Sequence, residues 1–168
     1  MIRDAMLAIS GRLDPTLGGP SFRDQEPTRA PGTPAMLYTP ADPSKPGLNR
    51  RTLYRVWARG GRSRFLSAFD CPDPSTTAPR RAVTTTPLQA LALMNNALVL
   101  YLSDAFANRL KRVAGDDPGR QVELAYRLAL GRTPEAEERS HAARVVQTFG
   151  AATLARALFN SNEFLYSD

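Results

Sequence analysis

The chain has only one cysteine, Cys71, and one histidine, His141, in 168 residues. A single cysteine excludes an internal disulfide, and a single histidine excludes a zinc site built from several imidazoles of this chain. No Cys-x-x-Cys-His motif occurs, so a c-type haem has no attachment site here. His141 lies in a predicted helix with no nucleophile at a recognisable spacing, which favours a helix-surface residue over a catalytic base. We therefore predict no metal ion, no cofactor and no catalytic residue in this chain.

Long apolar runs are also missing. No run reaches the roughly 18 to 20 residues that a membrane-spanning helix needs. The opening residues Met1 to Asp4 lack the apolar segment of a signal peptide. The sequence therefore predicts no membrane span and contains no targeting signal.

Lysine is scarce, so the net charge of +6 and the isoelectric point of about 10.1 come mainly from arginine. The arginines concentrate in segment 50–64, where aromatic residues are interleaved with them. Guanidinium groups bind phosphates and stack on bases, so nucleic-acid binding through this segment is one alternative. No recognised nucleic-acid motif accompanies it. The structural alternative is that Arg55 and Arg59 cover apolar neighbours or pair with Asp70 and Asp73.

The best-defined helix start lies at Thr86. Its hydroxyl can accept from the Gln89 amide while the Gln89 side chain reaches back, which is a capping box, and Pro87 suits the first helical position. Apolar residues then recur at three- and four-residue steps until Gly115. We predict one continuous helix over residues 86–114.

Three more helices follow by the same reasoning. They begin near Asp117, Thr133 and Gly150, where acidic residues, prolines or glycines interrupt apolar stripes. Residues 86–168 are therefore predicted to form a helical bundle of about four helices. The fold class is mainly α.

The first half is organised differently. Helical spacing of apolar residues predicts a helix over residues 1–14. Dense prolines and glycines then predict an irregular wrap over residues 15–85 with one or two short helices. We expect residues 1–168 to be a single domain and the C-terminal fragment of a larger one.

An acidic loop is the first candidate site. Asp70 and Asp73 are held close by prolines, so their carboxylates suit either a hard cation or an arginine. Calcium needs six to eight oxygen ligands, which favours ion pairs with arginines. The candidate partners are Arg50, Arg51, Arg80 and Arg81.

Side-chain amides provide the second candidate. Asn95 and Asn96 fall within the predicted long helix, where a buried amide must find a hydrogen-bond partner. They can bind a ligand or attach the proline-rich segment to the helix, and the sequence favours attachment. The candidate polar network also includes residues near the C-terminus, namely Asn160, Asn162 and Glu163.

An ordered series of motifs resembles planctomycete-specific domain one, a domain of unknown function (1553). The series comprises Asn49-Arg50-Arg51-Thr52-Leu53-Tyr54, Ala68-Phe69-Asp70, Arg80-Arg81, Thr86-Pro87-Leu88-Gln89-Ala90-Leu91, Glu123-Leu124-Ala125-Tyr126-Arg127, Gly131-Arg132 and Asn160-Ser161-Asn162-Glu163-Phe164. The resemblance covers essentially the whole chain and begins inside the domain. It therefore implies that the chain is the C-terminal portion only.

The resemblance implies a context more than a mechanism. Relatives are typically large exported bacterial proteins, often with a c-type cytochrome module, so it implies an extracytoplasmic location and a c-type haem elsewhere in the parent protein. The expected partners are the missing N-terminal part and either that cytochrome module or a polysaccharide. The leading hypothesis is a non-catalytic structural or interaction module. The alternatives are part of a carbohydrate-active or cytochrome-linked enzyme, and nucleic-acid binding through segment 50–64.

Overall fold

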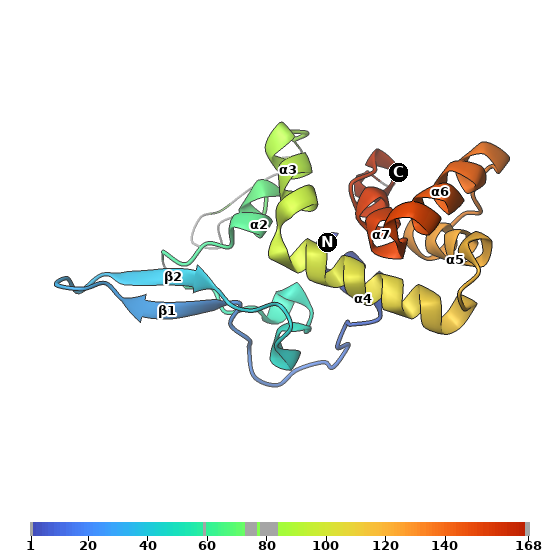
Figure 1. Ribbon diagram of the computed structural model, residues 1–168. Helices are drawn as coiled ribbons and strands as arrows, with labels where there is room; N and C mark the ends of the chain where they lie inside the picture. The colour runs from blue at the N-terminus through green and yellow to red at the C-terminus, as the bar shows by residue number, and fades with distance from the viewer. Residues whose placement is uncertain (1, 59, 73–76, 78–83, 167–168) are drawn as a thin grey trace. The chain divides into compact units, whose positions relative to one another are not determined.

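The chain is described by a computed structural model, which covers residues 2–58, 60–72, 77 and 84–166 (Figure 1). It divides into two compact units. The helical unit comprises residues 1–13 and 93–168, and the hairpin unit comprises residues 14–92. The predicted fold class is confirmed, because 56% of the structure is helical and the sheet is small.

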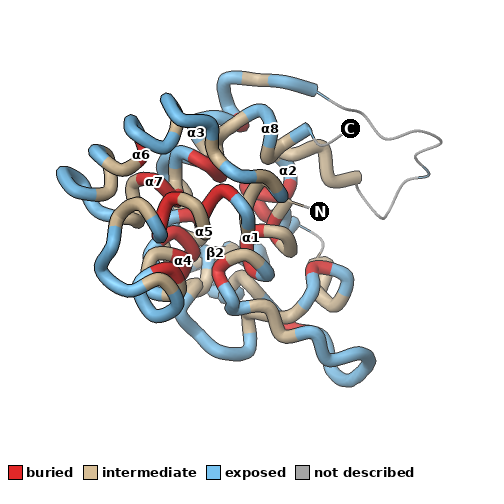
Figure 2. The backbone as a smooth tube through the Cα atoms, turned by 90° about the vertical axis from the view of Figure 1, so that its right-hand side faces the viewer, coloured by how far each residue is buried: buried red, intermediate tan, exposed pale blue. Residues whose placement is uncertain are grey.

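The described part of the helical unit contains six complete α-helices. They are α1 (Ile2–Ser10), α4 (Ala97–Ala114), α5 (Pro118–Leu130), α6 (Ala136–Phe149), α7 (Ala151–Phe159) and α8 (Asn162–Leu165). Helix α4 packs against α1, α5 and α7, and α6 packs against both α5 and α7. Figure 2 shows the buried residues gathered on the faces where α4, α5 and α7 meet. This arrangement is a helical bundle with α4 at its centre.

Large apolar side chains fill the core of this bundle. Phe106 on α4 and Phe159 on α7 are fully buried and stack with ring centroids 5.8 Å apart. Further fully buried side chains include Met6 and Leu7 on α1, Leu102 and Leu110 on α4, Val122 on α5 and Ala155 on α7. Burial of apolar surface on this scale is the main favourable term in folding, so packing defines this unit.

Helix boundaries in the bundle follow local chemistry. The Asp117 side chain accepts from the amides of Gly119 and Arg120, and the first helical residue is proline. Helix α5 ends at Gly131, which has a left-handed backbone (φ +72°). Helix α6 starts after Glu135, which forms a reciprocal capping box with Glu138. These stops and starts lie close to the predicted ones.

The prediction of one helix over residues 86–114 is wrong. The segment forms α3 (Pro87–Asn95) and α4, separated at Asn96. The Asn96 side chain accepts a hydrogen bond from the Leu98 amide at 3.0 Å and so caps α4. The side-chain oxygen of asparagine can accept from a backbone amide in place of a helical carbonyl. At Asn96 this ends one helix and begins the next. Among the described helices, none alone is long and apolar enough to cross a membrane. Helices α3 and α4, taken together as a bent pair, meet the length and composition of a membrane span, and no more than that.

Helix α1 is shorter than the predicted range of residues 1–14. It ends at Ser10, and Gly11 follows with a positive φ of +73°. The amides of Arg12 and Leu13 both donate to the Leu7 carbonyl, at 2.8 and 3.0 Å. Arg109 of α4 donates to the carbonyls of Ala8 and Ile9, at 3.0 and 2.7 Å. A left-handed glycine and an arginine cap therefore terminate α1.

The hairpin unit contains a two-stranded sheet, so the prediction of an irregular segment over residues 15–85 is wrong for part of it. Strand β1 (Gln25–Arg29) pairs antiparallel with β2 (Met36–Pro40), and Figure 1 shows the strands side by side. Few of their side chains are even half-buried. Because neither face of the sheet is buried, the strands lack the alternation of apolar and polar residues by which a sequence reveals a half-buried strand.

Each strand of the hairpin contains a proline, at Pro27 and Pro40. The Ala41 amide donates to the Asp24 carbonyl and the Ala30 amide donates to the Ala35 carbonyl. These two bonds show which residue pairs of the hairpin are hydrogen-bonded. Bonded and non-bonded pairs alternate in an antiparallel ladder, so both prolines occupy positions whose backbone faces outward. Proline has no N–H, and these are the positions where the ladder needs none.

The rest of the hairpin unit is held by short elements. They are the 3-10 turns η1 (Pro46–Leu48) and η2 (Thr52–Tyr54), helix α2 (Arg64–Ala68) and most of α3. The predicted capping box at the start of α3 is confirmed, because Thr86 and Gln89 exchange hydrogen bonds of 3.1 and 3.3 Å. The apolar core is small and includes Phe22, Phe65 and Leu66.

Candidate functional site

Arg50, a predicted site residue, binds backbone carbonyls of its own unit. Its guanidinium group donates to the carbonyl oxygens of Thr16, Gly18 and Pro20. The same group lies over the ring of Tyr54, 4.3 Å from the centroid. The Tyr54 hydroxyl accepts from the Gly18 amide at 2.8 Å. Arg50 and Tyr54 therefore hold the segment from Thr16 to Pro20, which contains Gly18 and Gly19, in place.

The neighbouring Arg51 is exposed and precedes η2. Arg55, which follows η2, has a nearly buried side chain. Its Nε donates to Asp24 Oδ1 at 2.7 Å and its Nη2 donates to the Gly61 carbonyl at 3.2 Å. The alternative that Arg55 pairs with Asp70 is wrong, because Arg55 pairs with Asp24, directly before β1.

Asp70 binds a threonine in the described part of the chain. Its Oδ2 accepts from both the amide and the hydroxyl of Thr84, each at 2.8 Å. Asp70 itself has a left-handed backbone (φ +53°), and Cys71 donates to the Leu66 carbonyl, which ends α2. The Thr84 hydroxyl also accepts from the Gln89 side chain at 3.3 Å. Asp70 thus connects the end of α2 to the start of α3.

Three predicted site residues and one expected ion-pair residue lie outside the described residues. They are Asp73, Arg80, Arg81 and Arg59. The predicted carboxylate pair and its ion pairs with the double arginine therefore stay predictions. Among the residues that are described, no group of three or more histidine, cysteine, aspartate or glutamate side chains is placed to hold a metal ion.

The two asparagines at the α3–α4 break have different surroundings. Asn95 is the last residue of α3 and is exposed, whereas Asn96 is half-buried and caps α4. Neither lies in the interior of a continuous helix, because the helix ends between them. The observed role of Asn96 is to bind the main chain, which is the structural alternative at this position.

The densest polar cluster of the helical unit surrounds Arg132, directly after α5. Its guanidinium group donates two hydrogen bonds to Glu138, at 2.7 and 2.8 Å. It donates two more to Glu163, at 2.7 and 2.9 Å. The guanidinium carbon lies 5.4 Å from the centroid of the Tyr126 ring. We call Tyr126, Arg132, Glu138 and Glu163 the Arg132 cluster.

The cluster changes the ionisation of its members. Hydrogen bonds from Arg132 and then from the Glu135 amide lower the pKa of Glu138 to about 2. Hydrogen bonds from Arg132 lower the pKa of Glu163, and both carboxylates raise the pKa of Arg132. Burial raises the pKa of Tyr126. Carboxylates whose pKa is lowered stay ionised near neutral pH, so neither Glu138 nor Glu163 is a proton donor there.

The other C-terminal candidates lie beside this cluster in sequence. Asn160 ends α7, and its amide donates to the carbonyls of Arg156 and Ala157, at 3.2 and 3.1 Å. Asn162 is the first residue of α8, which Ser161 caps through the Phe164 amide at 3.3 Å. Of the three candidates, Glu163 joins the Arg132 cluster. Residues 160–163 therefore position α8 so that Glu163 reaches Arg132.

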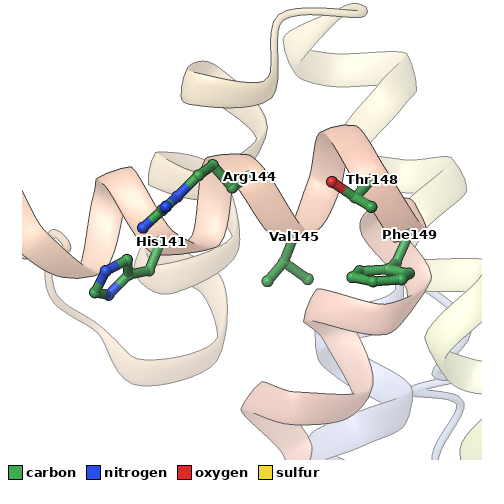
Figure 3. Close-up of a pocket in the computed structure, with 5 residues that line it drawn as sticks. All are labelled: His141, Arg144, Val145, Thr148 and Phe149. Atoms are coloured by element: carbon green, nitrogen blue, oxygen red, sulfur yellow. The ribbon is translucent and has the colours of Figure 1, made fainter.

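His141 lies on the exposed side of α6, as the sequence predicts. Figure 3 shows it with the other residues that line a shallow depression there: Arg144, Val145, Thr148 and Phe149. All five belong to a single helix. The residues that line this depression include no carboxylate, and the Thr148 hydroxyl is seven residues further along the same helix from His141.

Sequence reasoning missed the residues that organise these contacts. Arg132 was recognised only within a motif, and its partners lie 6 and 31 residues away. Asp24, which binds Arg55 across 31 residues, carried no signal at all. Within the described residues, the candidate side chains with known partners bind the main chain or side chains outside the predicted set, namely Thr84 and Arg132. The fold defines a mainly helical module.

The comparison with protein families places this module more narrowly. The family model described as PSD1, a protein of unknown function (DUF1553), matches residues 1–146. The match covers most of the 168 residues, so the chain belongs to this family. The resemblance inferred from the sequence motifs is confirmed. No curated protein and no solved structure matches the chain.

Proposed function

We propose that this chain is a non-catalytic structural and interaction module of a large exported protein, and that α3 is its docking surface. Support comes first from the polar residues. Arg50, Arg55, Asp70 and the Arg132 cluster bind groups within their own units. Side chains held in this way stabilise the fold and leave fewer groups to contact a substrate.

The observation that carries the proposal is an apolar stripe on α3. Leu88, Leu91 and Met94 are 63%, 55% and 50% exposed, and they recur every three residues along one helix. Leu93 of the same helix is fully buried, so the helix has an inner and an outer apolar face. An exposed group of large apolar side chains is typical of a protein-binding surface.

The composition of α3 favours a protein partner. The nine residues Pro87–Asn95 contain no charged side chain. Nucleic acids and acidic polysaccharides are bound through cationic side chains, whereas interfaces between parts of one protein are depleted of charge at their core. We propose that the occupant is the N-terminal part of the parent protein, outside the cytoplasm.

A binding experiment with matched variants tests the proposal. The chain and the N-terminal part of its parent are produced separately, and their affinity is measured by calorimetry for the wild type, Leu91→Glu and Val113→Glu. Val113 is 64% exposed on α4, so it matches Leu91 in exposure but not in location. We expect Leu91→Glu to weaken binding at least about tenfold, since a charge opposes burial in an apolar interface.

The control must behave differently from the test variant. Val113→Glu is expected to bind as the wild type does, and all three proteins should give the same circular dichroism spectrum. Equal affinity of Leu91→Glu and wild type would overturn α3 as the docking surface. Absence of binding by the wild type, or salt-sensitive binding of DNA by the chain in its place, would overturn the interaction with the parent.

A further inference from the structure

The guanidinium group of Arg55 has one nitrogen without a hydrogen-bond partner among the described residues, and its central carbon lies 5.3 Å from the centroid of the Trp57 ring. The side chain is only 3% exposed, and its charge is paired with Asp24 through Nε. Nη2 donates to the Gly61 carbonyl. Nη1 is buried and makes no hydrogen bond to any residue that the structure describes. A buried donor without an acceptor costs about 1–3 kcal/mol, and more when it is charged, so such groups nearly always have a partner.

Arg55 is one of the residues that line a small, partly open cavity of the hairpin unit. Its walls include Arg55 and Val56 from the segment after η2, Asp24 and Gln25 from the base of the hairpin, and Tyr38 from β2. Its volume is about 10 Å³. A cavity needs roughly 10–15 Å³ on this measure to hold one water molecule, so there is space for one water and no more.

The walls also supply acceptors. The Asp24 carboxylate binds Arg55 Nε through Oδ1, which leaves Oδ2 as a second oxygen on the same group. The Gln25 side chain donates to the Arg62 carbonyl through Nε2, and its Oε1 remains an acceptor. A buried water needs two to four polar partners, and this cavity combines a guanidinium donor with carboxylate and amide oxygens.

We infer that this cavity is a binding site for a single ordered water molecule, which accepts a hydrogen bond from Arg55 Nη1 and donates to an oxygen of Asp24 or Gln25. Charge favours water over an anion, because Asp24 already neutralises Arg55. Size favours it too, since chloride and bromide ions are larger than water. The bound water would join the base of β1 to the segment that follows η2. This inference is independent of the proposed docking surface.

A crystal structure of the full chain at high resolution tests the inference directly. We expect a density peak about 2.7–3.2 Å from Arg55 Nη1 in the wild type. Crystals grown with bromide distinguish the ligands, because bromide gives an anomalous signal and water does not. Absence of a peak, or an anomalous peak at that position, would overturn the water site.

A solution measurement adds a second readout. A water held in a buried site stays for longer than a nanosecond and gives cross-relaxation signals of a distinct sign with nearby protons. We expect such signals at the amide protons of Gln25 and Val56 in the wild type, and their loss in Arg55→Lys, which has no Nη1. Signals that persist unchanged in a folded Arg55→Lys would show that Arg55 is not the water's ligand.

Discussion

The helical unit and the hairpin unit are stabilised by different means. The helical unit buries large side chains completely, including the stacked Phe106 and Phe159. The hairpin unit buries few, and it relies on side chains such as Arg50, Arg55 and Gln25 that bind distant backbone carbonyls. The stability of the helical unit is spread over many weak apolar contacts, whereas that of the hairpin unit depends on a few directional hydrogen bonds.

This difference teaches why arginine dominates the charge of the chain. An irregular segment has carbonyl groups without helical or sheet partners, and these groups need donors. A guanidinium group offers five N–H donors on one planar group, so a single Arg50 can serve three carbonyls. At least two arginines of segment 50–64 therefore have structural roles.

The largest expected effect tests the packed core of the helical unit. Phe106→Ala removes a fully buried ring that stacks on Phe159, and we expect it to lower the free energy of unfolding by about 3–5 kcal/mol. Urea denaturation followed by circular dichroism measures the change. Val113→Ala on the same helix, where the side chain is exposed, should cost less than about 0.5 kcal/mol. Equal costs would contradict a core centred on α4.

A smaller effect is expected in the hairpin unit, at Gly61. A Cβ atom there would lie 3.0 Å from Tyr38 Cδ1 and 3.1 Å from Ala58 Cβ, neither of which is the end of a flexible chain. We expect Gly61→Ala to cost about 1–2 kcal/mol through overpacking. Hydrogen exchange should show the β1 and β2 amides becoming less protected.

Gly47→Ala provides the matched control for this prediction. A Cβ at Gly47 meets nothing within 4 Å, so this variant should leave the exchange of the hairpin amides unchanged. If both alanine variants behave alike, close approach at Gly61 does not hold the base of the hairpin.

The smallest expected effect concerns the Arg132 cluster and depends on pH. The pKa of Glu138 falls from an ordinary value of 4.5 to about 2 in the folded chain. The stability that Glu138 contributes is therefore fully present above about pH 4.5 and disappears as the pH falls through about 2. Glu138→Gln should cost below about 1 kcal/mol at pH 7, because the pair is partly exposed.

Acid titration of the unfolding free energy checks this sign. The gap between wild type and Glu138→Gln should be constant above about pH 5 and close on acidification. Glu137→Gln changes an exposed neighbour on α6 and should cost less than about 0.5 kcal/mol at pH 7. A gap that widens on acidification would contradict ionised Glu138 as the partner of Arg132.

Local chemistry predicted the parts of the fold that depend on neighbouring residues. The capping box at Thr86 and the glycine ends at Gly131 and Gly150 depend on groups within a few residues, so the sequence reveals them. Asn96 was misjudged because apolar periodicity continues across it. A side chain that both fits a helix and can cap one is decided by its three-dimensional surroundings.

The hairpin and the polar contacts were beyond such reasoning for a different reason. Strands β1 and β2 bury almost nothing, so no alternation marks them. Arg132 meets Glu163, and Arg55 meets Asp24, across 31 residues in each case. Spacing along the chain carries no information about partners at this separation. The family resemblance supplied Arg132 and Glu163 without their contact, and it supplied neither Arg55 nor Asp24.

The outward-facing prolines of the hairpin have a consequence for how the chain behaves at high concentration. An isolated two-stranded ribbon offers two open sides to which another extended chain can add, and repetition of that addition builds fibrils. Pro27 interrupts one side at mid-strand and Pro40 closes the other at its end. The ribbon is thereby protected from self-templated growth, although nearly all of its surface is in contact with solvent.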